Sequence, residues 1–200
     1  YLLRHNPEFE IYWVFRKGVD VSQLPEGVKV VRFRTWKYLK LMASAEFLLT
    51  NARTDPYRIY WHKRRGQKYA MLWHAGVALK RIEADAEAQL SFSYVQRAKA
   101  DSRVCDLMIS GCRMQTRLQR ERFWYDGEIL EEGIPRNDIF FAEERHDELR
   151  RAIAERYGLD PASRLILYAP TFRVDHSTAP YTIDWARVMP VVSSMFGGER

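Results

Sequence analysis

The chain has 200 residues, 46% of them hydrophobic and 14% aromatic, which is enough for one large domain or one domain and part of another. No apolar run approaches the roughly 20 residues that a membrane-spanning helix needs, and the first residues lack the pattern of a secretory signal. The net charge of +6 favours an anionic partner, and charge alone leaves open whether this is nucleic acid, acidic lipid or a phosphate-bearing substrate.

The first third of the chain predicts three strands and one helix. Runs rich in β-branched and aromatic residues indicate strands at 9–15, 28–33 and 47–50. Apolar residues at helical spacing indicate a helix at 36–45. The segment 53–67 has no periodic pattern and carries many cations, so we expect an exposed basic loop there.

Beyond this loop, buried strands alternate with helices. Strands are expected at 69–73, 104–109, 128–130 and 164–169, and a helix is expected to open at 77–82. Further helices are expected at 87–101, 112–123 and 143–157, with Ser110 as the cap of the second of these. This alternation predicts an α/β fold with a Rossmann-type parallel sheet.

Both ends of the sequence indicate a longer natural protein. Residues 1–5 resemble the end of a helix already under way, and residues 185–196 predict a helix that leads to an element further on. We therefore expect the sequence to be an excerpt.

Cysteines and histidines give no sign of a disulfide framework or a metal centre. Two cysteines, Cys105 and Cys112, favour a reducing compartment. No metal-ligand spacing connects the remaining histidines, His5, His62, His146 and His176.

A parallel sheet collects the carboxyl ends of its strands at one edge, where open α/β folds bind ligands. We therefore expect one crevice to be lined by the residues that follow the predicted strands, Asn51, His74, Ser110 and Gly133. The charged helix at 143–157 leads to a second α/β unit that starts at Arg164. A cleft between two such units is a usual site for a nucleotide-linked donor.

His74 is the main candidate for a chemical role. It follows the buried strand and precedes Gly76 and the predicted helix start, whose unpaired N–H groups and positive dipole end suit a phosphate. An imidazole beside a phosphate can accept the proton of an attacking hydroxyl near neutral pH. The alternative is a histidine packed at the end of a strand without a chemical role.

Five residues are candidates for contact with substrate or phosphate: Gly76, Lys80, Arg136, Thr171 and Arg173. Lys80 lies near the first turn of the predicted helix, and Arg136 follows a proline at the ligand edge, where its planar fork suits phosphate. Thr171 and Arg173 follow the strand at 164–169 and face the cleft if that sheet is parallel. A solvated Lys80 and a salt bridge between Arg136 and Asp138 are the alternatives.

The basic loop carries Arg58, Lys63, Arg64 and Arg65, with Tyr57, Tyr60 and Trp61 interleaved. Such a mixture suits an anionic lipid surface or a polyanionic acceptor. It would also suit single-stranded nucleic acid, on whose bases aromatic side chains stack. A solvated loop without a partner is the third interpretation.

Four motifs occur in one order along the chain. They are Arg65-Gly66-Gln67, Trp73-His74-Ala75-Gly76 with Lys80, Gly133-Ile134-Pro135-Arg136-Asn137-Asp138, and Leu167-Tyr168-Ala169-Pro170-Thr171-Phe172-Arg173. Together they resemble the CDP-glycerol glycerophosphotransferases, the primases and polymerases of wall teichoic acid synthesis, over essentially the whole chain. The histidine motif departs from the Trp-His-Gly-Thr-Pro-Leu-Lys of many members.

The resemblance implies a GT-B-like architecture, with an acceptor-side domain over residues 1–142. Residues 143–200 would form a linker helix and the beginning of a second Rossmann-type domain, which binds the nucleotide donor. It also implies that glycerol phosphate passes from CDP-glycerol to a hydroxyl of a lipid-linked glycan or polyol-phosphate acceptor, with His74 as the base. We expect a peripheral position on the inner, cytoplasmic face of the cell membrane, no nucleic-acid partner and no cofactor. The metal requirement is left open, and the excerpt alone should be inactive.

Two other functions fit the same residues. One is a non-catalytic basic α/β module that binds polyanions. The other is a sugar-nucleotide glycosyltransferase of the GT-B type.

Overall fold

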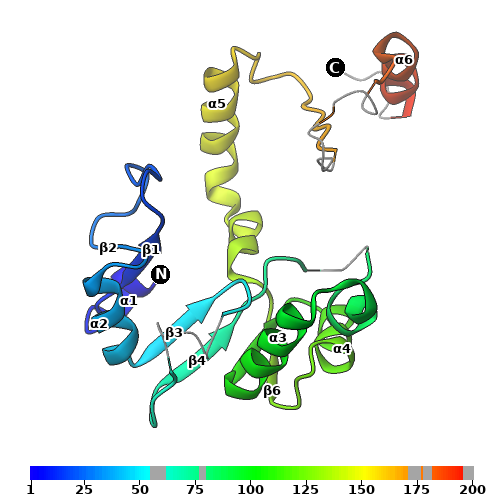
Figure 1. Cartoon of the computed structure of the whole chain (residues 1–200). Helices are drawn as coiled ribbons and strands as arrows, with labels where there is room; N and C mark the ends of the chain where they lie inside the picture. The colour runs from blue at the N-terminus through cyan, green and yellow to red at the C-terminus, as the bar shows by residue number, and fades with distance from the viewer. Residues whose placement is uncertain (55–61, 77–79, 171–176, 178–181, 196–200) are drawn as a thin grey trace. The chain divides into compact units, whose positions relative to one another are not determined.

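A computed structural model describes residues 1–54, 62–76, 80–170, 177 and 182–195. Within them, two parallel sheets form (Figure 1). The first pairs β1 (Tyr12–Phe15) with β2 (Lys29–Arg32). The second has the order β3-β4-β5-β6, with the bounds Phe47–Thr50, Lys68–Met71, Leu107–Ser110 and Glu128–Glu131.

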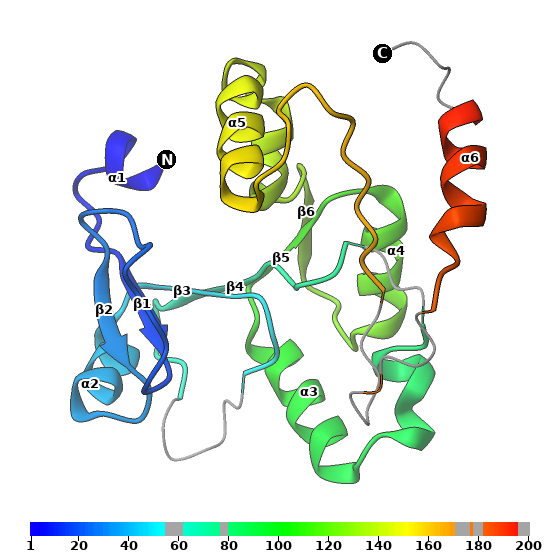
Figure 2. The same ribbon diagram turned by 90° about the horizontal axis from the view of Figure 1, so that it is seen from above.

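Helices connect and flank these strands. The α-helices are α1 (Leu2–His5), α2 (Trp36–Ser44), α3 (Phe92–Val104), α4 (Arg113–Arg122), α5 (His146–Tyr157) and α6 (Trp185–Met195). Three 3-10 helices, η1 (Glu83–Gln89), η2 (Pro135–Phe141) and η3 (Glu143–Arg145), complete the described elements. Figures 1 and 2 show α3 and α4 in green beside the four-stranded sheet.

Local sequence explains where the helices begin and end. Thr35 precedes α2, and its side chain accepts a hydrogen bond from Tyr38 N; Ser91 does the same for Tyr94 N before α3. Gly158 ends α5 in the left-handed conformation, at φ 64°. The helices predicted at 36–45 and 143–157 are therefore confirmed, apart from the 3-10 turn η3 at the start of the second.

The core is built from residues of β4 and β5 and of the segments that adjoin the four-stranded sheet. It consists of Tyr69, Met71, Trp73, Cys105, Met108, Phe123 and Tyr125. α4 packs against β5 and β6, so a helix covers this part of the sheet, as its apolar strand sequences indicate. The prediction of a Rossmann-type parallel sheet is confirmed.

The basic segment after β3 differs from the predicted exposed loop. At its two ends, the side chain of Arg53 is only 7% exposed and Gln67 is buried. Gln67 Nε2 donates to Ala45 O at 2.7 Å. The prediction is wrong at both ends because each side chain finds partners in distant parts of the chain; residues 55–61 lie outside the described residues.

Three further predictions differ from the structure. Ser110 is the last residue of β5 and does not cap α4, whose N-cap is Cys112. Residues 80–82, predicted as helix, are not helical; Ile82 is extended, and residues 77–79 lie outside the described ones. Residues 164–169 form no strand, because no other described strand pairs with them, and Leu165, Ile166 and Leu167 are exposed.

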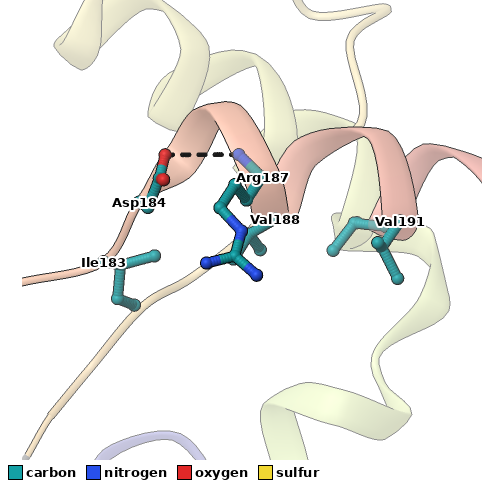
Figure 3. A pocket seen from close by; sticks show the side chains of 6 residues that line it. Ile183, Asp184, Arg187, Val188 and Val191 are labelled. Carbon is teal, nitrogen blue, oxygen red and sulfur yellow. Dashed lines mark hydrogen bonds between the residues drawn. The ribbon is translucent and has the colours of Figure 1, made fainter.

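The chain divides into two compact units, Tyr1–Ala142 and Glu143–Arg200. The second unit carries an open hollow at the start of α6, lined mainly by apolar side chains (Figure 3). There Arg187 N donates to Asp184 Oδ1 at 3.3 Å. No described helix is both long and apolar enough to cross a membrane. Which unit faces the acceptor and which the donor stays a prediction.

The two cysteines should differ in reactivity. Burial raises the pKa of the Cys105 thiol to about 11, whereas Cys112 is exposed. Because the thiolate is the reactive form, a thiol reagent at pH 8 should label Cys112 in the native chain and reach Cys105 only after unfolding. Peptide mass spectrometry before and after denaturation measures this. Equal labelling of both residues in the native protein would contradict the burial of Cys105 in the core.

Candidate active site

The parallel register brings the carboxyl ends of four strands to one edge of the sheet. β3 and β4 pair up to Thr50 and Met71, and β5 and β6 pair up to their last residues. The pairing of β3 with β4 continues one step further, where Leu72 N donates to Thr50 O at 2.8 Å. The chain leaves this edge through Asn51, His74, Gly111 and Gly133. The sequence predicted three of these residues, whereas the predicted Ser110 is the buried last residue of β5.

A left-handed residue turns the chain outward after β4. Trp73 has φ 52°, an uncommon value for a bulky side chain. The residue is 8% exposed, and its indole packs edge-on against the Phe123 ring, with the ring centroids 4.9 Å apart. Buried packing thus holds Trp73 inside, and the next side chain, His74, is exposed at the edge of the sheet.

A backbone carbonyl orients the imidazole of His74. Its Nδ1 lies 3.1 Å from Asn51 O, and a carbonyl oxygen only accepts hydrogen bonds. Nδ1 therefore carries a hydrogen, and in the neutral ring Nε2 holds the free lone pair. A ring fixed in this tautomer can accept a proton at Nε2.

Arg136 supports the same loop. Its Nη2 donates to His74 O at 2.9 Å and to Trp73 O at 3.4 Å. Among the described residues, its guanidinium contacts these carbonyls, and no ion pair joins it to the Asp138 carboxylate. The salt-bridge alternative is therefore wrong: Arg136 connects the loop after β6 to the histidine loop.

A close packing contact joins the loops after β4, β5 and β6. A Cβ at Gly111 would lie 2.7 Å from Ile134 Cγ1, whereas a Cβ at Gly76 would lie 3.5 Å from Ile134 Cδ1. The buried Gln115 adds two hydrogen bonds, from Gly111 N to its Oε1 at 2.8 Å and from its Nε2 to Ala75 O at 3.4 Å. Space therefore requires glycine at position 111 and not at position 76.

Sequence reasoning missed a buried charged cluster beside this edge. The side chain of Arg53 is 7% exposed and forms ion pairs with Glu83 at 2.9 Å and Asp101 at 3.2 Å. Burial raises the pKa of Asp101, against the effect of the hydrogen bonds from Thr54, Tyr69 and Arg53. One signal was available: Asp101 lies in a helix next to Ser102, on the face that also buries Val95 and Ala98.

The other predicted contact residues are not gathered at this edge. Lys80 is exposed and is not in a helix. Lys63 pairs with Asp106 at 2.6 Å, and Arg64 Nη2 donates to Ser44 O at 3.0 Å. These contacts lie near the amino ends of β4 and β5, at the opposite edge from His74. Arg65 is exposed there too, while Arg58, Thr171 and Arg173 lie outside the described residues.

The described residues contain no cluster of three or more His, Cys, Asp and Glu side chains placed to hold a metal ion. The edge where His74 lies provides an oriented imidazole and a guanidinium. Such groups suit proton transfer and the binding of an anion.

The fold and this edge define a GT-B-like α/β protein with a histidine at its ligand edge. Comparison with known protein families identifies the family. The sequence model of the CDP-glycerol:poly(glycerophosphate) glycerophosphotransferase family matches residues 1–189, and the chain belongs to this family.

Known relatives agree with this assignment. The teichoic acid poly(glycerol phosphate) polymerase of Staphylococcus epidermidis is 30% identical over 181 residues, covering 88% of this chain and 24% of that protein. The polymerase of the same name from Bacillus spizizenii is 30% identical over 172 residues, covering 83% and 42%. The chain thus spans less than half the length of these relatives.

A solved structure shares the fold. It is a histidine-to-alanine variant of the wall teichoic acid polymerase TagF, which superposes with a TM-score of 0.71 at 26% identity. The match covers 87% of this chain and 43% of that one.

Gly111→Ala should lower the free energy of unfolding by about 1–3 kcal/mol, because the added methyl overlaps Ile134. Gly76→Ala is the matched control, since its methyl would make an ordinary contact with the same side chain. Urea unfolding of both variants measures the difference. Shortening the partner, in Gly111→Ala with Ile134→Val, should recover part of the loss, and equal stability of the two single variants would contradict the contact.

Proposed function

We propose that the protein transfers glycerol phosphate from CDP-glycerol to a hydroxyl of a lipid-linked acceptor in the synthesis of a teichoic-acid-type polymer. Membership of the glycerophosphotransferase family supports the reaction class. The observation that supports a chemical role for this part of the protein is the exposed His74, with Nδ1 bound to Asn51 O.

In the proposed step, the acceptor hydroxyl attacks the β-phosphorus of CDP-glycerol. The new P–O bond forms as the bond to the CMP oxygen breaks, and CMP leaves with the electron pair. His74 Nε2 takes the hydroxyl proton, because its lone pair is free in the tautomer that the Asn51 carbonyl favours. The phosphoanhydride of the donor already drives the transfer, so the step needs no organic cofactor.

Phosphoryl transfer depends chiefly on positioning and on stabilising the charge of the transferred group. Arg136 is the described cation nearest to the histidine backbone, and one of its nitrogens, Nη2, holds the carbonyls of Trp73 and His74. We assign its remaining N–H groups to a phosphate of the donor or of the acceptor. Gly76, Lys80, Thr171 and Arg173 stay candidates for further contacts.

The partners follow from the same proposal. A lipid-linked glycan or polyol-phosphate acceptor requires the protein to work at a membrane surface, so we propose a peripheral position on its cytoplasmic face. The net charge of +6 supports attraction to anionic lipid. Arg58, Lys63, Arg64 and Arg65 are the proposed contacts, although Lys63 and Arg64 already bind Asp106 and the end of α2.

His74→Ala in the full-length protein should lower kcat by about 10²–10⁴-fold with little change in KM, because general-base catalysis contributes that much. Since the side chain is exposed, added imidazole should restore part of the lost turnover. CMP release measures both effects. His146→Ala, which removes another exposed histidine, is the control. Full turnover by His74→Ala would exclude His74 as the general base.

A donor screen should distinguish the proposed substrate from its competitors. The full-length protein should release CMP from CDP-glycerol in the presence of acceptor and should react much more slowly with CDP-ribitol and UDP-sugars. Release of nucleotide from a UDP-sugar, with none from CDP-glycerol, would instead indicate a glycosyltransferase. Binding of polyanions without any turnover would indicate a non-catalytic module.

A further inference from the structure

We propose that Arg53 is a positioning residue for His74: locked between Glu83 and Asp101, it fixes the backbone whose Asn51 carbonyl orients the imidazole. This inference rests on the proposed role of His74 as the base. It concerns a residue that touches neither the histidine nor any reacting atom.

The guanidinium of Arg53 has all its donors in use. Nε and Nη2 donate to Glu83 Oε2 at 3.3 and 2.9 Å, and Nη2 also donates to Phe123 O at 3.2 Å. Nη1 donates to Asp101 Oδ2 at 3.2 Å and to Ser102 Oγ at 2.7 Å. These hydrogen bonds match the five N–H donors of an arginine, and the Phe123 ring lies 4.9 Å from the guanidinium carbon. The side chain therefore has one orientation.

The backbone between this cluster and the sheet is short and tied at both ends. On one side, Thr50 ends β3, and its Oγ1 donates to Ala52 O at 2.8 Å and accepts from Ala52 N at 3.2 Å. On the other side, Thr54 N donates to Asp101 Oδ1 at 3.2 Å, and the Thr54 hydroxyl binds the same oxygen. The Asn51 carbonyl lies between these anchors, so its direction depends on both.

The same cluster anchors the chain that follows the histidine. Glu83 begins η1, nine residues after His74, and has a left-handed backbone with φ 51°. Its carboxylate is 2% exposed and also accepts from Tyr94 OH at 2.6 Å. Arg53 therefore connects the segment that supplies the orienting carbonyl to η1, which begins nine residues after the imidazole.

Stability alone does not explain a buried charged cluster. The side chains of Glu83 and Asp101 are 2% and 0% exposed, and removing charges from water costs free energy that their attraction only partly offsets. Apolar side chains of similar size would often give equal stability without fixed directions. Directional contacts are what the cluster adds, and they fix Arg53 and Thr54, two and three residues after Asn51.

Two conservative variants test this in the full-length protein. Arg53→Lys keeps the charge with three donors in place of five, and Glu83→Gln keeps the shape while removing one charge. Each should lower kcat by about tenfold to a hundredfold, the range seen when a group that orients a functional imidazole is disturbed, with KM changed less than about threefold. Val31→Ala, which removes volume from a buried site in the other sheet, is the control for lost stability. If Arg53→Lys does not fold, Glu83→Gln carries the test alone.

A double-mutant cycle with His74→Ala decides whether the effect passes through the histidine. If Arg53 acts through His74, Arg53→Lys should change the residual turnover of His74→Ala less than about twofold. A full additional loss in that background would overturn the inference. The inference would also be overturned if Arg53→Lys and Glu83→Gln both had the same kcat as Val31→Ala.

The two proposals fail in different ways. Unchanged turnover by His74→Ala would remove the base and the positioning role together. A large loss by His74→Ala, with no specific effect of Arg53→Lys and Glu83→Gln, would leave the proposed function intact and overturn only the inference about Arg53.

Discussion

The parallel direction of β3, β4, β5 and β6 is the constraint on which the candidate site depends. Because all four strands end at one edge, short loops suffice to bring an orienting carbonyl, an imidazole and a guanidinium together. At the opposite edge, cationic side chains have a structural role. There Lys63 and Arg64 bind Asp106 and the last carbonyls of α2, so the cations of that segment help to hold the amino ends of the strands.

The sequence predicted those features that depend on local pattern. Apolar runs predicted the strands of the central sheet, and their alternation with helices placed His74 at the ligand edge. Gly158 ends α5 at the predicted position, whereas the predicted cap Ser110 belongs to β5. The resemblance in four short motifs agrees with the family match over residues 1–189.

Long-range partnership was not predictable in the same way. Arg53 lies in a run of cations that is typical of solvated loops, and its acceptors on Glu83 and Asp101 are 30 and 48 residues away in the sequence. The run at 164–169 has the composition of a strand, but a strand requires a neighbour, and none of the described strands pairs with it. The glycines are a further example. The sequence pointed to Gly76 as a site residue, whereas the glycine with no space for a Cβ is Gly111.

Phe123 gives the core and the ligand edge a common support. Its ring contacts both the Trp73 indole and the Arg53 guanidinium, and its carbonyl accepts from Arg53 and Ser102. Phe123 is also the C-cap of α4. A small displacement of this helix end would carry the indole and the guanidinium in the same direction, so thermal motion of α4 would shift the imidazole and its orienting backbone as a pair and preserve the spacing between them.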